Sequence, residues 1–352
     1  MAGLSPLLVG PASVTTSEIK MPSNQRLFGY DALKALAAFF VVLYHVGMVD
    51  FGYREGVYYY PTLVQEIWLF CACGVPLFFM INGALTVNRN YDFKRVVTKS
   101  ARLLFVGSFW AVVVMCLLSL RENNWKYFSI RMIGYYWFLF SLAAIYLINF
   151  VLCRLPGWCR WLVVASLLVF PFATNLAWDI VILKNPQTSL VEWRHGVFTL
   201  YGIVYLYIGD YLGPRHLAKW IPVVCAIAGL TLLSIETIAV VNRTHCQFEG
   251  GNYCFPTYGA MLLSVALFLL IKDWNPRSKS VKRVISFLGS NALGIYIFHL
   301  ILMIVVGVCF PVFYDMVVHP VVAILIAMGY TIVSAMLSEL IKRSPAAILM
   351  RL

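Results

Sequence analysis

Long apolar segments separated by short polar stretches recur along the whole chain of 352 residues. The segments at Ala32–Val49 and Ser286–Phe310 are long enough to cross a bilayer, because a spanning helix takes about 20 apolar residues. Their hydrophobicity is continuous, whereas the strands of an outer-membrane barrel alternate between apolar and polar positions. The pattern therefore predicts an all-α integral membrane protein.

About ten such segments follow one another, and each is expected to form a transmembrane helix. They cover residues 32–49, 66–87, 101–120, 133–152, 160–175, 196–213, 220–241, 256–271, 286–310 and 318–341. Because ten is an even number, both termini are expected on the same side of the membrane. The membrane domain is expected at residues 26–345, between an N-terminal tail at 1–25 and a C-terminal tail at 346–352.

The composition agrees with a membrane bundle. Hydrophobic residues make up 61% of the chain, charged residues only 12%, and the mean hydropathy is +0.82. A soluble domain of this size could not bury so much apolar surface. The 23 Gly and 15 Pro are spread through the apolar segments, which excludes a collagen-like or disordered chain.

The net charge of +12 has a topological explanation. Lys and Arg concentrate in cytoplasmic loops, and a cytoplasmic N-terminus places 20 of the 27 basic residues on that side. The 7 others are Arg54, Arg121, Lys126, Arg131, Lys184, Arg194 and Arg243. We therefore expect both termini in the cytoplasm, a multi-pass location in the cell (inner) membrane among membrane lipids, and no nucleic-acid partner.

The cysteines give little sign of a metal or redox centre. Cys71 and Cys73 form a C-x-C pair with no neighbouring histidine or carboxylate, so we expect them to pack as small hydrophobic residues. Cys246 and Cys254 lie in a loop expected outside, where an oxidising compartment would permit a disulfide. The sequence leaves that pairing open and predicts no metal site.

The first expected helix carries ionisable groups, which are costly inside a bilayer and therefore candidates for function. Asp31 and Lys34 are three residues apart, close enough to pair at the cytoplasmic end. His45 follows on the same face after about three turns, or about 16 Å. A helix-end ion pair and an interhelical hydrogen bond are the purely structural alternatives. An imidazole titrates near neutral pH, however, which suits a general base.

A basic stretch follows the second expected helix. Lys99 and Arg102 are three residues apart at the start of a helix, so both side chains can face inward. Together with Lys34 they predict a basic opening suited to a phosphorylated ligand. The alternative is that these charges only mark the cytoplasmic side.

Further polar and aromatic residues stand at or near membrane depth. Asn82 and His299 lie within apolar segments, and Tyr296 precedes His299 by one turn. They could serve only as interhelical hydrogen-bonding groups. Trp137 belongs to a set of aromatic residues on the expected outer side, where an interfacial belt and a platform for stacking sugars are both possible.

Four segments together resemble membrane-bound acyltransferase family 3. Arg26–His45 is similar to the family's first helix, Gly74–Gly83 to its second-helix motif, Trp137–Leu142 to its W-F-L-Y segment, and Leu293–His299 to its G-I-Y-x-x-H motif. The order and the spacing of the four segments also agree with the family, and the resemblance covers nearly the whole chain.

Two positions depart from the family pattern. Lys34 stands where arginine is more common, which weakens bidentate phosphate binding but keeps the charge. Asn82 stands where serine is usual, so a role for a hydroxyl at that position is in doubt.

The resemblance implies O-acyl transfer, usually of acetyl from cytoplasmic acetyl-CoA, to a hydroxyl of a cell-surface glycan or lipid-linked sugar outside the cytoplasm. His45 is then the expected general base, with an acyl-histidine as the lesser alternative, and Asp31 positions Lys34 or another base at the opening. The expected CoA-binding residues are Lys34, Lys99, Arg102, Arg26 and Arg95. The expected substrate-binding residues are Trp137, Asn82, Tyr296 and His299.

Two other classes of protein remain open at this point. A carrier or flippase of a lipid-linked glycan or small solute would also be a helical bundle with polar groups at its midplane. The second half of the chain, however, shows no repeat of the Asp31, Lys34 and His45 pattern. A membrane scaffold would leave the basic opening unexplained. Motifs for ATP hydrolysis, serine hydrolysis and zinc proteolysis are absent from the sequence.

Overall fold

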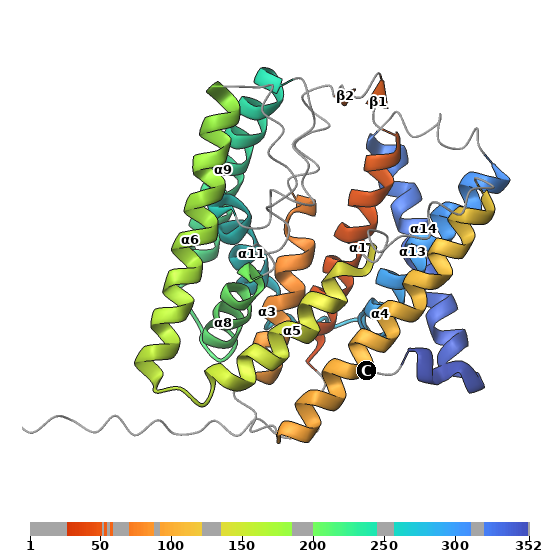
Figure 1. The fold of residues 1–352 in the computed structure, drawn as a ribbon, viewed down its shortest axis with the longest axis horizontal. Coiled ribbons are helices and arrows are strands. Elements are labelled where there is room, and N and C mark those ends of the chain that lie inside the picture. Colours follow the sequence, from red (N-terminus) through yellow and green to blue (C-terminus); the bar gives the residue numbers. More distant parts are fainter. Residues whose placement is uncertain are drawn as a thin grey trace, which may run out of the picture.

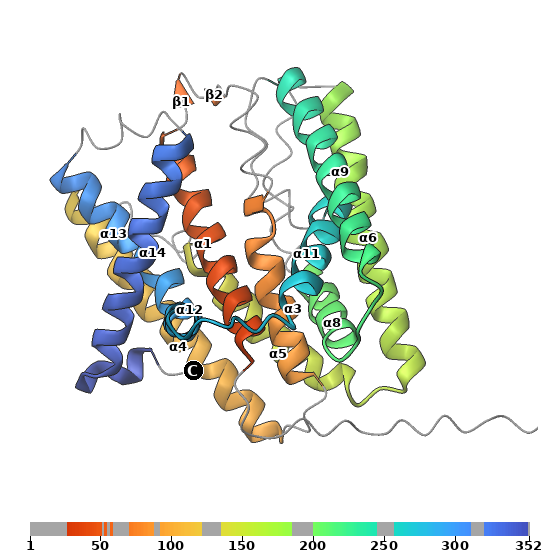
Figure 2. The same cartoon turned by 180° about the vertical axis from the view of Figure 1, so that it is seen from behind.

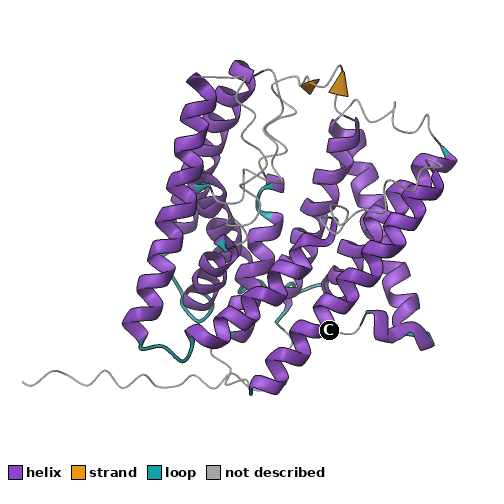
Figure 3. Cartoon of the chain, viewed as in Figure 1, coloured by secondary structure: helices purple, strands orange, loops and turns teal. Residues whose placement is uncertain are grey.

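The computed structural model describes residues 27–50, 53–54, 57–58, 70–87, 92–121, 135–184, 200–244, 257–310 and 320–350. Almost all of this described chain is helical (Figure 3). The elements are α1 (Phe28–Asp50), β1 (Tyr53–Arg54), β2 (Val57–Tyr58), α3 (Gly74–Thr86), α4 (Phe93–Arg121), α5 (Trp137–Leu152), α6 (Gly157–Lys184), α8 (Tyr201–Leu212), α9 (Trp220–Thr244), α11 (Tyr258–Ile271), α12 (Lys279–Ser290), α13 (Ala292–Cys309), α14 (Pro320–Lys342) and the 3-10 helix η4 (Pro345–Leu349). The strands β1 and β2 pair antiparallel.

The helices form one bundle with two flanks. Figure 1 shows α6, α8, α9 and α11 on one side, α4, α13 and α14 on the other, and α1, α3 and α5 between them. The view from behind in Figure 2 gives the same order. In this bundle α3 packs against α8, α4 against α5, α9 against α11, and α1 against α3, α12, α13 and α14. We call the end at the bottom of Figure 1, where α4 begins, the lower end.

Several helices of the described chain suit a bilayer by length and composition. Four are long and apolar enough to cross a membrane, with candidate spans at Phe28–Val46, Phe93–Leu120, Ala292–Cys309 and Val321–Lys342. Shorter apolar helices of 10–17 residues lie among them. The expected all-helical membrane fold is thus confirmed, while the number of ten spans and the cytoplasmic termini stay predictions.

The membrane helix expected at 286–310 begins later than predicted, because the chain forms two helices there. The amphipathic α12 ends at Ser290 and α13 begins at Ala292. Between them the fully buried Asn291 donates to the Phe287 carbonyl oxygen at 2.9 Å and accepts from Ser338 Oγ at 2.7 Å. The apolar half of α12 is continuous with α13 in the sequence, so hydropathy alone merges the two helices.

Glycines bring α3 and α8 into close contact. A Cβ at Gly83 would overlap the Leu206 carbonyl oxygen, and a Cβ at Gly209 would overlap the Met80 carbonyl oxygen. Small residues allow this approach of two backbones, which is a common way of packing helices in membranes. The contact fixes α3, whose last turn contributes to the lower pocket described below.

Candidate active site

Helix α1 carries the three ionisable residues singled out in the sequence. It is continuous from Phe28 to Asp50, so a straight rise of 1.5 Å per residue separates Lys34 from His45 by about 16 Å. At the lower end Lys34 Nζ lies 3.6 Å from Asp31 Oδ1, which is the expected ion pair. The carboxylate side chain is only 10% exposed and that of the lysine 32%. The structure therefore places the charge pair and the imidazole at different depths.

A second histidine lies beside the first. The ring centroids of His45 and His299 are 5.1 Å apart, and His299, which α13 contributes, is fully buried. Its Nδ1 lies 2.9 Å from the carbonyl oxygen of Ile295. A carbonyl oxygen only accepts hydrogen bonds, so Nδ1 carries the proton and Nε2 keeps its lone pair. Within the described residues that buried Nε2 has no hydrogen-bond partner.

Buried aromatic rings surround this pair of histidines. The Tyr296 ring lies 6.1 Å from that of His299 and 5.5 Å from that of Phe138. The fully buried Tyr136 donates from its hydroxyl to the Ile297 carbonyl oxygen at 3.0 Å. That bond ties the segment before α5 to the helix of His299. The sequence places Tyr136 among the outer aromatic residues and Phe138 in the segment that begins at Trp137, but it selects only Trp137 as a site residue.

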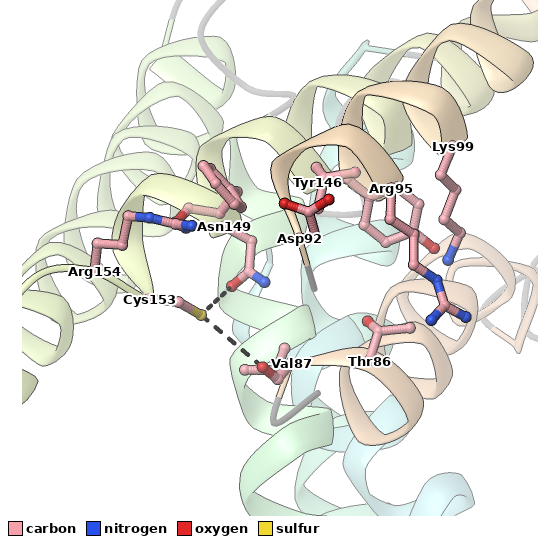
Figure 4. Close-up of a pocket in the computed structure, with 11 residues that line it drawn as sticks. Thr86, Val87, Asp92, Arg95, Lys99, Tyr146, Asn149, Cys153 and Arg154 are labelled. Atoms are coloured by element: carbon pink, nitrogen blue, oxygen red, sulfur yellow. Dashed lines mark hydrogen bonds between the residues drawn. The ribbon is translucent and has the colours of Figure 1, made fainter. Parts of the chain in front are cut away.

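A separate pocket of about 410 Å³ opens at the lower end of the bundle. It lies between the end of α3, the start of α4 and the end of α5 (Figure 4). Its lining residues are Thr86, Val87, Asp92, Arg95, Val96, Lys99, Tyr146, Asn149, Phe150, Cys153 and Arg154. This set contains three cations (Arg95, Lys99 and Arg154) and one carboxylate (Asp92), so the pocket favours an anionic ligand. We call it the lower pocket.

Hydrogen bonds connect the lower pocket to α3. Lys99 Nζ lies 4.0 Å from the centre of the Tyr146 ring, a cation–π contact. The Tyr146 hydroxyl donates to Asn82 Oδ1 at 2.5 Å, and Asn82 Nδ2 donates to the Phe78 carbonyl oxygen at 2.8 Å. The Asn82 amide therefore belongs to the wall behind this pocket.

Aromatic side chains continue from this wall to the histidines. The Phe78 ring lies 5.5 Å from the Phe138 ring, which in turn contacts Tyr296. Along α5 the rise from Tyr146 to Phe138 is about 12 Å. The lower pocket and the pair of histidines are thus joined by packed side chains of α3, α5 and α13.

The chain matches a known protein family along most of its length. A family model described as an acyltransferase domain matches residues 27–340, which is most of the chain. The chain belongs to acyltransferase family 3. Comparisons with curated proteins and with solved structures find no match. Family membership makes the chain a membrane acyltransferase in general terms.

The basic opening expected of this acyltransferase is only partly assembled in the structure. Arg95 and Lys99 line the lower pocket and extend from α4 toward Thr86 (Figure 4). Arg102 does not line it and is exposed, because it lies about 10 Å farther along α4 than Arg95. Lys34 does not line it either, since α1 contributes no residue to this pocket. Arg26, which was also expected to bind CoA, lies outside the described residues.

Arg154 completes the basic lining and was missed in the sequence. It follows α5, and its guanidinium lies 3.2 Å from the centre of the Phe150 ring and donates to the Phe150 carbonyl oxygen at 2.8 Å. In the sequence it resembles any positive charge at a helix end. Only the contact of α4 with α5 shows that it faces the same space as Lys99.

The remaining predicted site residues fall in different places. Trp137 is partly buried at the start of α5, with its ring 6.4 Å from that of Phe138. Cys71 and Cys73 are buried free thiols, as expected from their apolar setting. The described chain holds no group of three residues that could bind a metal ion. The possible disulfide between Cys246 and Cys254 lies outside the described residues.

Proposed function

We propose that this acyltransferase moves an acetyl group from cytoplasmic acetyl-CoA to a hydroxyl of an extracytoplasmic glycan. The observation that carries the proposal is the lower pocket with its three cations, joined through buried aromatic side chains to the pair of histidines. A ten-span topology with cytoplasmic termini and a location in the inner membrane belong to the same proposal. In that topology the lower pocket opens to the cytoplasm.

The lower pocket fits the phosphorylated part of CoA. Arg95, Lys99 and Arg154 supply charge-assisted donors of the kind that phosphates bind. The Phe150 ring holds the Arg154 guanidinium, 3.2 Å from its centre, at the wall of the pocket. CoA is long and thin beyond its phosphates, so its pantetheine arm can extend toward the histidines. Lys34, held by Asp31 on α1, then stabilises charge at the same end of the bundle.

The chemistry proposed for the histidines is general-base catalysis. His45 takes the proton from the acceptor hydroxyl, whose oxygen attacks the thioester carbonyl carbon. A C–O bond forms, the C–S bond breaks, and the proton held by His45 passes to the sulfur of CoA. His299 accepts at Nε2 a hydrogen bond from a neighbouring hydroxyl of the sugar and so holds the reacting hydroxyl beside His45. Burial of the His299 ring and of the aromatic side chains around it limits access of water, which would otherwise hydrolyse the thioester.

Cys153 provides a direct test of donor binding. This half-buried thiol lines the lower pocket, with its Sγ 3.6 Å from Asn149 Oδ1. Maleimide labelling of the full chain in lipid nanodiscs is followed at Cys153 by peptide mass spectrometry. Cys159, which is also half-buried but does not line the pocket, is the internal control.

Acetyl-CoA should slow the labelling of Cys153 and leave that of Cys159 unchanged. Protection should be lost in Arg95→Ala and kept in Lys94→Ala, because Lys94 is exposed on the same helix and does not line the pocket. Labelling of Cys153 that acetyl-CoA does not change, at concentrations that support turnover, would refute the donor site.

A further inference from the structure

A second charged cavity lies at the lower end, on the other flank of the bundle. It has a volume of about 320 Å³ and lies between the turn that joins α8 to α9 and the end of α11. It shares no residue with the lower pocket. Its lining residues are Arg215, His216, Leu217, Lys219, Pro222, Leu269, Leu270, Lys272 and Asp273. We call it the α8–α11 cavity.

One wall of the α8–α11 cavity contains a buried ammonium group. The side chain of Lys272 is only 2% exposed, and its Nζ donates to Asp273 Oδ2 at 2.7 Å and to the Gly213 carbonyl oxygen at 3.3 Å. The same carboxylate oxygen lies 3.2 Å from His216 Nδ1. Asp273 is thus shared between two neighbours, and it is the only carboxylate among the lining residues.

The lining therefore carries excess positive charge. Arg215 and Lys219 are exposed at the mouth, and the Arg215 guanidinium lies 3.7 Å from the centre of the Tyr211 ring. With Lys272 they make three cations against one carboxylate among the lining residues, before any proton on His216 is counted. Lysine and arginine side chains supply the charge-assisted donors that phosphate oxygens accept.

The other wall of the cavity is apolar. Leu217, Pro222, Leu269 and Leu270 supply it, and Leu270 is 55% exposed at the end of α11. Trp220, at the start of α9, is 65% exposed. Exposed tryptophan and leucine at the ends of apolar helices are typical of the level where lipid headgroups meet acyl chains. A water-soluble phosphate compound would use the charged wall and leave the apolar wall in water.

From this charge complementarity and this amphipathic lining we infer that the α8–α11 cavity binds an anionic membrane phospholipid. The phosphate contacts Arg215, Lys219 and Lys272, and the acyl chains lie along Leu270 and Trp220. Basic pockets between helices on the cytoplasmic side bind lipid headgroups in this way. The bound lipid would join α8, α9 and α11 at one end, and α8 in turn packs against α3 of the candidate active site.

The test measures lipid binding and needs no turnover, so its result is independent of the proposed acyl transfer. The purified full chain in detergent is titrated with phosphatidylglycerol, or with phosphatidylcholine of the same acyl chains, and bound lipid is counted by native mass spectrometry. We expect tighter binding of phosphatidylglycerol. The variant Arg215→Ala/Lys219→Ala should bind it about thirtyfold more weakly, since each surface cation contributes about a factor of five.

The matched control removes two cations from α12, at the same end of the bundle. Lys279 and Arg283 are exposed and do not line the cavity, so Lys279→Ala/Arg283→Ala should bind phosphatidylglycerol like the unchanged chain. Equal weakening in both double variants would show general attraction to basic residues and overturn the site. Equal binding of the two lipids, or displacement by the same concentration of glycerol phosphate, would overturn the assignment to a phospholipid.

Discussion

Replacing Lys99 by alanine should weaken acetyl-CoA binding without disturbing the fold. The side chain lines the lower pocket, and its Nζ lies 4.0 Å from the centre of the Tyr146 ring. With acetyl-CoA bound, the ammonium is expected to make one charge-assisted contact with a phosphate, and the variant loses that contact. Such a contact contributes about 1.5–3 kcal/mol, which corresponds to about a 10- to 150-fold rise in Kd.

The assay is isothermal titration of acetyl-CoA into the purified chain in nanodiscs at two salt concentrations. The Kd of the unchanged chain should rise with salt, and that of Lys99→Ala should rise less steeply because one ion contact is gone. Lys94→Ala is the matched control, as an exposed lysine of the same helix that does not line the pocket. A Kd for Lys99→Ala equal to that of Lys94→Ala would refute the donor pocket.

Three further predictions concern packing and positioning. Gly209→Ala should lower the free energy of unfolding by about 1–3 kcal/mol, because its Cβ would overlap the Met80 carbonyl oxygen. The control Gly329→Ala should not lower it, since no atom lies within 4 Å of a Cβ at that position. Equal unfolding midpoints of the two variants in mild denaturant would contradict this. Asn291→Ala should cost about 1–3 kcal/mol in the same assay, since it leaves the buried Ser338 hydroxyl without this acceptor and removes one contact of Lys342. A cost below about 0.5 kcal/mol would count against that network. Tyr136→Phe should lower kcat for transfer and leave the Kd for acetyl-CoA unchanged, because its hydroxyl donates to the helix of His299 and Tyr136 does not line the lower pocket. A changed Kd with unchanged kcat would contradict that role.

The sequence predicts the parts of the site that lie within one element. Asp31, Lys34 and His45 share one helix, so their order and separation follow from a rise of 1.5 Å per residue. The apolar pattern predicts most helices because each pattern also lies within one continuous segment of the chain. The break at Asn291 escapes it, because a single polar residue between two apolar segments has no effect on hydropathy large enough to separate them.

Contacts between elements could not be predicted in this way. Nothing local relates His45 on α1 to His299 on α13, and their ring contact depends on how these helices pack. Arg154 joins Lys99 in the lower pocket only because α4 and α5 pack side by side. Arg102 fails to join them because depth along α4, and not only the face of the helix, decides which cations reach the pocket.

The proposed role of His45 is general-base chemistry on a donor bound from the lower end. Its most direct measurement follows label from radioactive acetyl-CoA into a glycan extract, using the purified chain in nanodiscs with and without His45→Ala. We predict that the unchanged chain transfers label, and that His45→Ala does not, although it binds acetyl-CoA with the same Kd and unfolds at the same midpoint. Transfer by His45→Ala at the rate of the unchanged chain would contradict the account.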